Sequence, residues 1–215
     1  MKQYVLLDLD GTLTDPGVGI TNSVMYALAK FNIKETDRTK LYPFIGPPLM
    51  ESFQRYYNMT PRESRQALDY YREYFSTKGL FENEVYDGCA QFLATLNAKG
   101  YSLILASSKP EIYVKQILDH FDLSKYFLFI GGSDFEETRV CKKDVIHYCL
   151  QSAKISAKDS IMIGDRMHDV EGAKANGMKC IGVLYGYGSQ KELEDAGANA
   201  LAADFDQLLR AIETI

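Results

Sequence analysis

The sequence predicts an α/β fold, with helices on both faces of a parallel sheet and an all-helical segment inserted after the first strand. Two observations support this prediction. From Gly88 onward, short apolar runs alternate with amphipathic stretches of helical period, as expected for parallel strands joined by helices. Residues 17–80, in contrast, show helical periodicity and contain no strand-like run. We therefore expect an α/β core of residues 1–16 and 81–215 and an all-helical cap of residues 17–80.

The first strand is expected in the apolar run that begins at Tyr4 and ends at two aspartates. The insert then starts with a helix over Gly17–Phe31, and a loop rich in proline and glycine follows over residues 41–49. Two further helices are expected over Leu49–Tyr57 and Pro61–Thr77. The last of these carries an aromatic stripe, which is typical of a helix face packed in a core.

The remaining elements follow the alternation of the core. Its other strands are expected at residues 101–106, 126–130, 160–163, 179–184 and 200–202. Its helices are expected at residues 88–99, 110–120, 143–153, 170–176 and 204–212. In an open parallel sheet, ligands bind outside the carboxyl ends of the strands. The residues that follow each apolar run are therefore the candidates for function.

Composition and charge limit the classes of partner. The 215 residues carry a net charge of −5, and no cluster of lysine and arginine offers a surface for a nucleic acid polymer. Because an apolar strand is predicted directly after the first three residues, we expect no signal peptide, and no apolar run is long enough to span a membrane. The four cysteines form no Cys-x-x-Cys pair, so we expect free thiols and a cytoplasmic protein.

Asp8 and Asp10 end the first strand, and their spacing of two places both side chains on one face of an extended backbone. Two carboxylates this close repel each other unless they share a cation or a proton. Mg²⁺ is the natural cation for such oxygen ligands, although a solvated turn would also use aspartate and glycine. A calcium loop is excluded because it needs glycine at its sixth position and glutamate at its twelfth, where this chain has Leu13 and Gly19.

Polar residues also follow two other predicted strands. Ser107 and Ser108 come after the second strand, and Asp165 and Asp169 come after the strand at residues 160–163. Each has a simpler explanation, since the serines and Asp169 could cap helices and Asp165 could form a solvated ion pair. Taken together, however, these residues and the two acids of the first strand would all lie at one edge of the sheet. This coincidence favours a single site.

These residues resemble the motifs of the haloacid dehalogenase-like hydrolases. The segment Asp8–Leu13 resembles the first motif, Ser107 the second and Gly164–Asp169 the fourth. The third motif is a lysine, for which Lys142 is preferred over Lys143 because of its spacing to the helix that follows. Many members have a proline directly after that lysine, and this chain does not.

The resemblance implies a Rossmann-like core and a phosphatase that uses Mg²⁺ and an aspartyl-phosphate intermediate. Asp8 would be the nucleophile, and Asp10 would protonate the leaving alcohol and then activate water. An alkoxide leaving group needs such a proton and a halide does not, so Asp10 favours phosphate esters. The family pattern implies that Asp8, the backbone carbonyl of Asp10 and Asp165 bind the metal, with Asp169 as a further ligand or as a residue that orients one.

The resemblance also implies a set of groups that hold the phosphate oxygens. This set contains the lysine of the third motif, the hydroxyl of the second motif and backbone amides. Its residues are Gly11, Thr12, Ser107, Ser108 and Lys142.

The helical cap resembles that of phosphoglycolate phosphatase-like members, which implies a small phosphorylated metabolite as the substrate. Ile45, Gly46 and Pro47 are expected to reach the substrate and set specificity, although a rigid link between two cap helices is the alternative. A phosphomutase or a pyrophosphatase of the same family would use the same acids. A signalling module phosphorylated on aspartate is a more remote alternative, because the insert suits the enclosure of a substrate.

Overall fold

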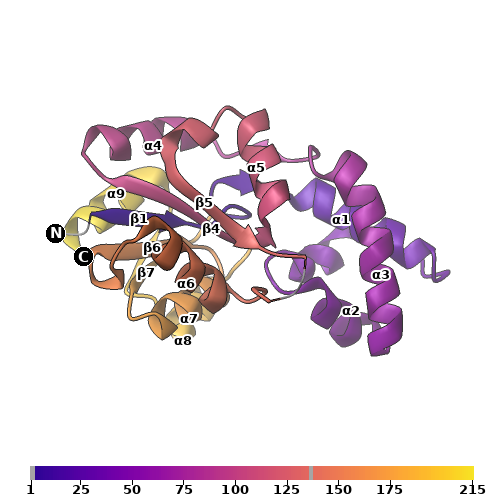
Figure 1. The fold of residues 1–215 in the computed structure, drawn as a ribbon. Coiled ribbons are helices and arrows are strands. Elements are labelled where there is room, and N and C mark those ends of the chain that lie inside the picture. The colour runs from indigo at the N-terminus through magenta and orange to yellow at the C-terminus, as the bar shows by residue number, and fades with distance from the viewer. Residues whose placement is uncertain (1–2, 136–137) are drawn as a thin grey trace. The chain divides into compact units, whose positions relative to one another are not determined.

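The chain folds into two compact units in a computed structural model, which describes residues 3–135 and 138–215 (Figure 1). The first unit contains the chain up to Thr14 and again from Val85, and the second contains Asp15–Glu84. Both boundaries fall within short strands, β2 (Thr14–Asp15) and β3 (Glu84–Val85). The division into a catalytic core and a cap stays a prediction, because compactness alone assigns no role to either unit.

A six-stranded sheet forms the centre of the first unit, and every pair of neighbouring strands in it is parallel. The central strands are buried on both faces, as Val5, Leu6 and Leu7 show by being fully buried. The predicted α/β fold is thereby confirmed. In spatial order the strands are β5 (Phe127–Ser133), β4 (Ser102–Pro110), β1 (Tyr4–Leu7), β6 (Ser160–Gly164), β7 (Lys179–Val183) and β8 (Ala200–Ala202).

Helices cover both faces of this sheet (Figure 1). On one face lie α4 (Cys89–Ala98), α5 (Glu111–His120) and α9 (Phe205–Thr214). On the other face lie α6 (Lys142–Ala153), α7 (Met167–Ala175) and α8 (Gln190–Ala196). The core on this second face is apolar, with Leu6 and Met162 from the strands against Val145 and Val170 from the helices. Because helices cover both faces of the sheet, polar groups that act together are expected at the ends of the strands.

Two elements of the first unit differ from the sequence prediction. β4 continues to Pro110, beyond the expected end at residue 106, and its pairing with β5 shifts register between Ala106 and Pro110. The extension keeps residues 107–109 extended, so that they alternate in direction. The sequence predicts no helix where α8 lies, because this short helix buries only Leu193 and has no apolar periodicity.

The second unit is helical between its two short boundary strands. Thr60 and Glu63 form a capping box at the start of its third α-helix: the Thr60 N–H donates to Glu63 Oε2 over 2.8 Å, and the Glu63 N–H donates to Thr60 Oγ1 over 3.3 Å. The first helix ends at Ala29 rather than Phe31, and a π-helical turn replaces the end of the last predicted helix. The elements are α1 (Gly17–Ala29), η1 (Arg38–Phe44), α2 (Leu49–Tyr57), α3 (Pro61–Tyr74) and η2 (Phe75–Gly79).

Two further expectations concern membrane-spanning segments and the state of the cysteines. Within residues 3–135 and 138–215, no helix has both the length and the apolar composition that crossing a bilayer requires. All four cysteines are free, with Cys89, Cys149 and Cys180 buried and Cys141 exposed.

Candidate active site

The first motif forms a tight turn at the carboxyl end of β1. The backbone N–H of Asp8 donates to Ile163 O of β6 over 2.9 Å, so this residue still continues the sheet. The chain then turns back on itself, because the N–H of Leu13 donates to Leu9 O over 2.9 Å. Gly11 adopts φ +81, and a Cβ there would lie closer than 3.0 Å to the carboxylate of Asp165. Only glycine at this position therefore allows the turn to lie this close to Asp165.

Asp165 and Asp169 follow β6, and both side chains are almost completely buried. Asp169 caps α7, since its Oδ2 accepts the backbone N–H of Arg166 over 3.1 Å. A Cβ on Gly164 would collide with the Asp169 carboxylate, so this glycine makes room for it. The capping role considered from the sequence is thus present, and Asp169 lies in the acid cluster as well.

Asp8, Asp165 and Asp169 each offer an oxygen, and these three atoms lie within 4.8 Å of one another. Burial raises the pKa of Asp165, and the neighbouring charges of Asp169 and Asp8 raise it further. Among the described residues, no hydrogen-bond partner reaches Asp165 Oδ1, which is buried. An unpartnered buried oxygen within a set of carboxylates fits a divalent cation with oxygen ligands. The cluster is therefore a candidate metal site.

Lys142 begins α6 and inserts its ammonium among these acids. Its Nζ lies 2.7 Å from Asp8 Oδ1 and 2.8 Å from Asp169 Oδ1, and it donates to Ala106 O over 3.0 Å. Burial alone would lower the pKa of Lys142, but Asp169 and Asp8 raise it above its usual value. Lys143, the competing candidate, is exposed. The structure thus brings Lys142, and not its neighbour, into the cluster.

Asp10 makes an ion pair that the sequence reasoning missed. Lys109 Nζ lies 2.8 Å from Asp10 Oδ1, and both side chains are largely buried. Burial raises the pKa of Asp10, and Lys109 acts against that change. One signal could have revealed the pair. Ser107 and Lys109 are spaced by two, so on an extended β4 they share a face, as Asp8 and Asp10 do.

The predicted phosphate-binding groups differ in burial and in the hydrogen bonds that they already make. Ser107 is buried and accepts the Lys109 N–H at its Oγ over 3.3 Å, whereas Ser108 is half-buried. The amides of Gly11 and Thr12 already donate within the turn, to Thr14 O over 2.8 Å and to Leu9 O over 3.2 Å. Their role in binding phosphate stays a prediction.

The three predicted specificity residues belong to the second unit. Ile45 follows η1, and its N–H donates to Tyr42 O over 2.9 Å. Gly46 adopts φ +104, a backbone conformation that residues with a Cβ rarely adopt, and Pro47 comes directly after it. This geometry describes a constrained loop, and contact with a substrate stays a prediction.

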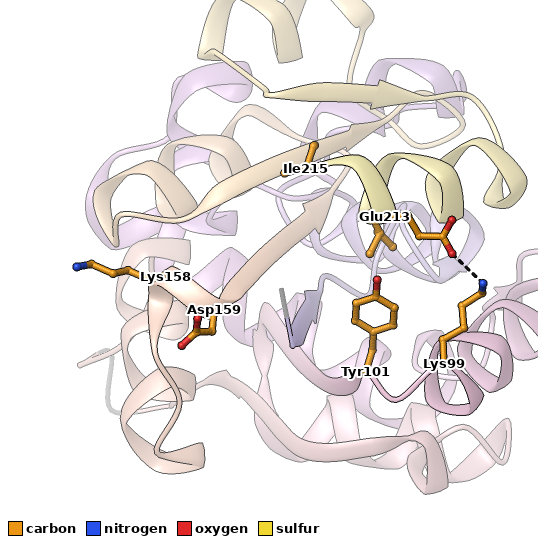
Figure 2. A pocket seen from close by; sticks show the side chains of 7 residues that line it. Lys99, Tyr101, Lys158, Asp159, Glu213 and Ile215 are labelled. Carbon is orange, nitrogen blue, oxygen red and sulfur yellow. Dashed lines mark hydrogen bonds and ion pairs between the residues drawn. The ribbon is translucent and has the colours of Figure 1, made fainter. Parts of the chain in front are cut away.

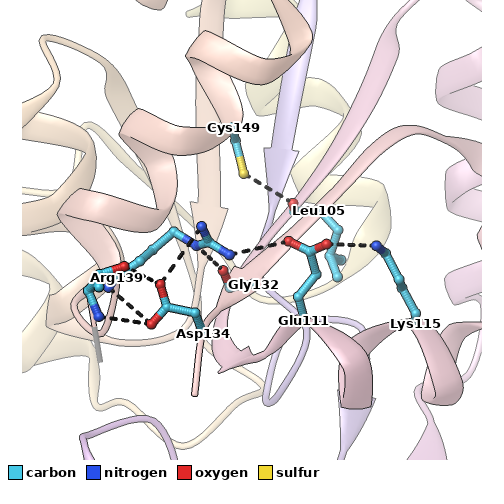
Figure 3. A network of polar contacts seen from close by, with 8 residues as sticks. Leu105, Glu111, Lys115, Gly132, Asp134, Arg139 and Cys149 are labelled. Atoms are coloured by element: carbon cyan, nitrogen blue, oxygen red, sulfur yellow. Dashed lines mark hydrogen bonds and ion pairs between the residues drawn. The ribbon is translucent and has the colours of Figure 1, made fainter. Parts of the chain in front are cut away.

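A polar network surrounds Arg139, three residues before Lys142 (Figure 3). Arg139 Nε donates to Gly132 O over 2.7 Å, and its guanidinium lies 3.6 Å from Glu111 Oε2 and 3.9 Å from Asp134 Oδ2. The same guanidinium stacks over Tyr148, with 3.8 Å between its carbon and the ring centroid. The network ties the start of α6 to β5 and α5, and thereby supports the lysine at the start of that helix.

A hollow elsewhere on the first unit lies away from these acids (Figure 2). Tyr101 and Asp159 in its lining directly precede β4 and β6, so the hollow lies at the amino ends of the strands, opposite the acid cluster. It is lined by Lys99, Tyr101, Lys158, Asp159, Ile212, Glu213 and Ile215.

A buried lysine and three buried acids lie together at the carboxyl edge of a parallel sheet. The chain belongs to the haloacid dehalogenase-like hydrolases, because the model of that family matches residues 5–183. Among curated proteins it is 43% identical over 210 residues to a 5'-nucleotidase of Pseudomonas aeruginosa, covering 98% of this chain and 95% of that one. It is also 33% identical over 213 residues to the tyrosine-protein kinase PtkA of Mycobacterium tuberculosis, covering 98% of this chain and 72% of the kinase.

The similarity extends to solved structures. The crystal structure of a predicted phosphatase from Clostridium acetobutylicum is 48% identical, with a TM-score of 0.97 and full coverage of both chains.

Phosphoglycolate phosphatases are more distant relatives, and that of Colwellia psychrerythraea is 24% identical over 220 residues, covering 99% of this chain and 97% of the relative. The predicted family is therefore confirmed.

Proposed function

We propose that this protein is a Mg²⁺-dependent phosphatase that hydrolyses small phosphate monoesters, with nucleoside 5'-monophosphates as its preferred class of substrate. The observation that carries the proposal is the buried carboxylate of Asp8, 2.7 Å from the ammonium of Lys142 and two residues from a second acid. Similarity to a 5'-nucleotidase at 43% identity supports nucleotides over phosphoglycolate, because phosphoglycolate phosphatases among the relatives are 24% to 27% identical.

In the first step, a carboxylate oxygen of Asp8 forms a bond to phosphorus while the bond from phosphorus to the ester oxygen breaks. The proton on Asp10 moves to the departing alkoxide, which leaves as an alcohol. In the second step, water attacks the aspartyl-phosphate and gives a proton to Asp10. Inorganic phosphate leaves, and Asp8 becomes a carboxylate again.

The other residues of the cluster hold these groups and balance their charge. Lys142 places a positive charge beside Asp8, which lowers the repulsion between a carboxylate and an anionic phosphate. Lys109 holds one oxygen of Asp10, so the carboxyl group keeps a defined orientation toward the leaving group. Ser107 supplies a hydroxyl at the same edge of the sheet.

Asp8, Asp165 and Asp169 are the residues that would hold the metal ion. When bound, Mg²⁺ supplies positive charge that neutralises the phosphoryl oxygens. Magnesium fits better than calcium here, because Ca²⁺ takes more ligands at longer distances than three carboxylates and a phosphate provide.

A panel of phosphate esters tests the proposal. Release of inorganic phosphate is measured for AMP, CMP, GMP, UMP, phosphoglycolate, a sugar phosphate and pyrophosphate, each with Mg²⁺ and after chelation. We expect a higher kcat/KM for at least one nucleotide than for phosphoglycolate, and no turnover without metal. Turnover that survives exhaustive chelation would contradict the metal requirement. A preference for pyrophosphate, or conversion of the sugar phosphate to an isomer, would favour the pyrophosphatase or phosphomutase alternative.

Transfer to a tyrosine hydroxyl is a second candidate, favoured by the 33% identity to a tyrosine-protein kinase. The same aspartyl-phosphate would then pass its phosphoryl group to a phenol instead of water, and the phenol would give its proton to Asp10. Incubation with a labelled nucleotide and a tyrosine-containing peptide distinguishes the two acceptors. Label on free phosphate alone supports the phosphatase, and label on tyrosine supports transfer.

A further inference from the structure

The segment that directly follows β7 and Leu184 lies against the acid cluster. The backbone N–H of Tyr187 donates to Asp165 Oδ2 over 2.7 Å. A Cβ on Gly186 would lie 2.5 Å from the same oxygen, and a Cβ on Gly188 would lie closer than 3.0 Å to the backbone oxygen of Asp165. Neither glycine can carry a side chain unless Asp165 moves, so the backbone of this segment is part of the wall around that carboxylate.

The two carboxylate oxygens of Asp165 have different surroundings. A Cβ on either Gly11 or Gly186 would lie closer than 3.0 Å to Oδ2, and this oxygen accepts the amide proton of Tyr187. Oδ1 is buried without a hydrogen-bond partner among residues 3–135 and 138–215. A hydrogen bond to one oxygen limits rotation of the carboxylate plane, so the other oxygen has a defined direction.

Tyr185 connects the same segment to the catalytic turn. Its hydroxyl donates to Thr12 O over 3.1 Å. Its ring packs against Tyr86 and Phe205, with centroid distances of 5.2 Å and 5.3 Å. One short segment thus contacts both the turn that carries the nucleophile and the acid from the neighbouring strand.

We propose that Tyr185–Gly188 is a positioning segment, which orients Asp165 so that Oδ1 is its metal-binding oxygen. This inference rests on the proposed metal-assisted phosphatase and adds a role for residues outside the four sequence motifs. The segment acts through Asp165 and the catalytic turn, and it needs no contact with the substrate. Its effect is therefore on the affinity for the metal ion.

Metal binding without substrate tests this role. Binding of Mn²⁺ is measured by electron paramagnetic resonance of the free ion for the wild type, Gly186→Ala and Gly177→Ala. Gly177 is a matched control, because its φ of +71 strains an alanine while a Cβ there meets nothing within 4 Å. We expect about tenfold weaker binding for Gly186→Ala, the size usual for loss of a group that orients a ligand, and wild-type binding for Gly177→Ala.

The outcomes separate this inference from the function it rests on. Wild-type affinity in a folded Gly186→Ala protein would overturn the positioning role and leave the metal site intact. Absence of Mn²⁺ binding to the wild type would refute the metal site itself, and the positioning role with it.

A second measurement covers the case in which Gly186→Ala does not fold. Hydrogen exchange of the wild type is followed with and without Mg²⁺. We expect slower exchange of the Tyr187 amide with the ion, because fixing Asp165 stabilises the hydrogen bond that this amide donates. Unchanged exchange of this amide at saturating Mg²⁺ would overturn the proposal.

Discussion

At Asp8, a strand end, a buried ammonium and two further acids come together. Replacement by asparagine keeps the size of the side chain and removes the negatively charged carboxylate that would attack phosphorus in the proposed mechanism. We expect Asp8→Asn to stay folded, as judged by circular dichroism, and to lose about 10³-fold or more of kcat. Asp195→Asn is the control, since Asp195 makes an exposed ion pair with Lys191 and should leave kcat unchanged. Full activity in a folded Asp8→Asn protein would refute the nucleophile.

Lys109 is expected to act through Asp10. Removal of its charge by Lys109→Met frees the Asp10 carboxyl group to rotate, which weakens proton delivery to the leaving oxygen. Single-turnover release of the alcohol should slow about tenfold or more for an alkyl phosphate and less for 4-nitrophenyl phosphate, whose leaving group needs little protonation. Lys109→Arg should restore part of the alkyl rate.

Lys191→Met provides the control for this prediction, because Lys191 pairs with Asp195 at an exposed position. Equal losses for both esters in Lys109→Met would show that the lysine does not serve the proton transfer.

At the scale of single elements, the capping box should contribute to the stability of α3. Thr60→Ala removes the hydroxyl that accepts the Glu63 N–H and should lower the free energy of unfolding by about 1 kcal/mol. Urea unfolding followed by circular dichroism measures the change. Thr77→Ala is the control, since that hydroxyl is exposed and donates to the carbonyls of Glu73 and Tyr74 at the other end of α3. Equal stability of the two variants would argue against the cap.

The loop after η1 tests the predicted source of specificity. Gly46→Ala introduces a Cβ at φ +104, which changes the local backbone. We expect the ratio of kcat/KM between a nucleotide and phosphoglycolate to change several-fold, as a one-carbon change in a pocket does. Gly100→Ala has a comparable φ of +87 in the first unit and should leave the ratio unchanged. An unchanged ratio in both variants would indicate that the loop is a connector.

For the whole molecule, buried thiols predict a loss of stability at alkaline pH. Burial raises the pKa of Cys89 and of Cys149 to about 12, from the value of 9.0 that an exposed thiol has. In each case the folded pKa is above the unfolded one, so the stabilisation is complete below pH 9 and is lost as the pH rises from 9 toward 12. At pH 10 the loss should be on the order of 1 kcal/mol for each thiol.

Urea unfolding at pH 8 and pH 10 measures this loss. Cys89→Ala should show a smaller difference between the two pH values than the wild type, whereas Cys141→Ala, at an exposed position, should change this difference less. An identical pH dependence in Cys89→Ala and the wild type would contradict the prediction.

Local pattern alone was enough to predict much of this molecule. The alternation of apolar runs with helical stretches predicted the parallel sheet, because a strand buried on both faces must be apolar along its length. The apolar run from Tyr4 also predicted a first strand that leads directly to Asp8. Both inferences depend on periods of a few residues, which a sequence shows directly. The helix α8 escaped prediction because so short an element needs no apolar period.

Tertiary structure decided which distant side chains meet. Lys142 and Lys143 are both plausible by sequence, and only the packing of α6 on the sheet buries the first among the acids. The pair between Lys109 and Asp10 depends on β4 lying beside β1. The contact from Tyr187 to Asp165 depends on β7 lying beside β6. These contacts join residues far apart in the chain, and the order and register of the strands bring them together. Local periodicity carries no information about that order.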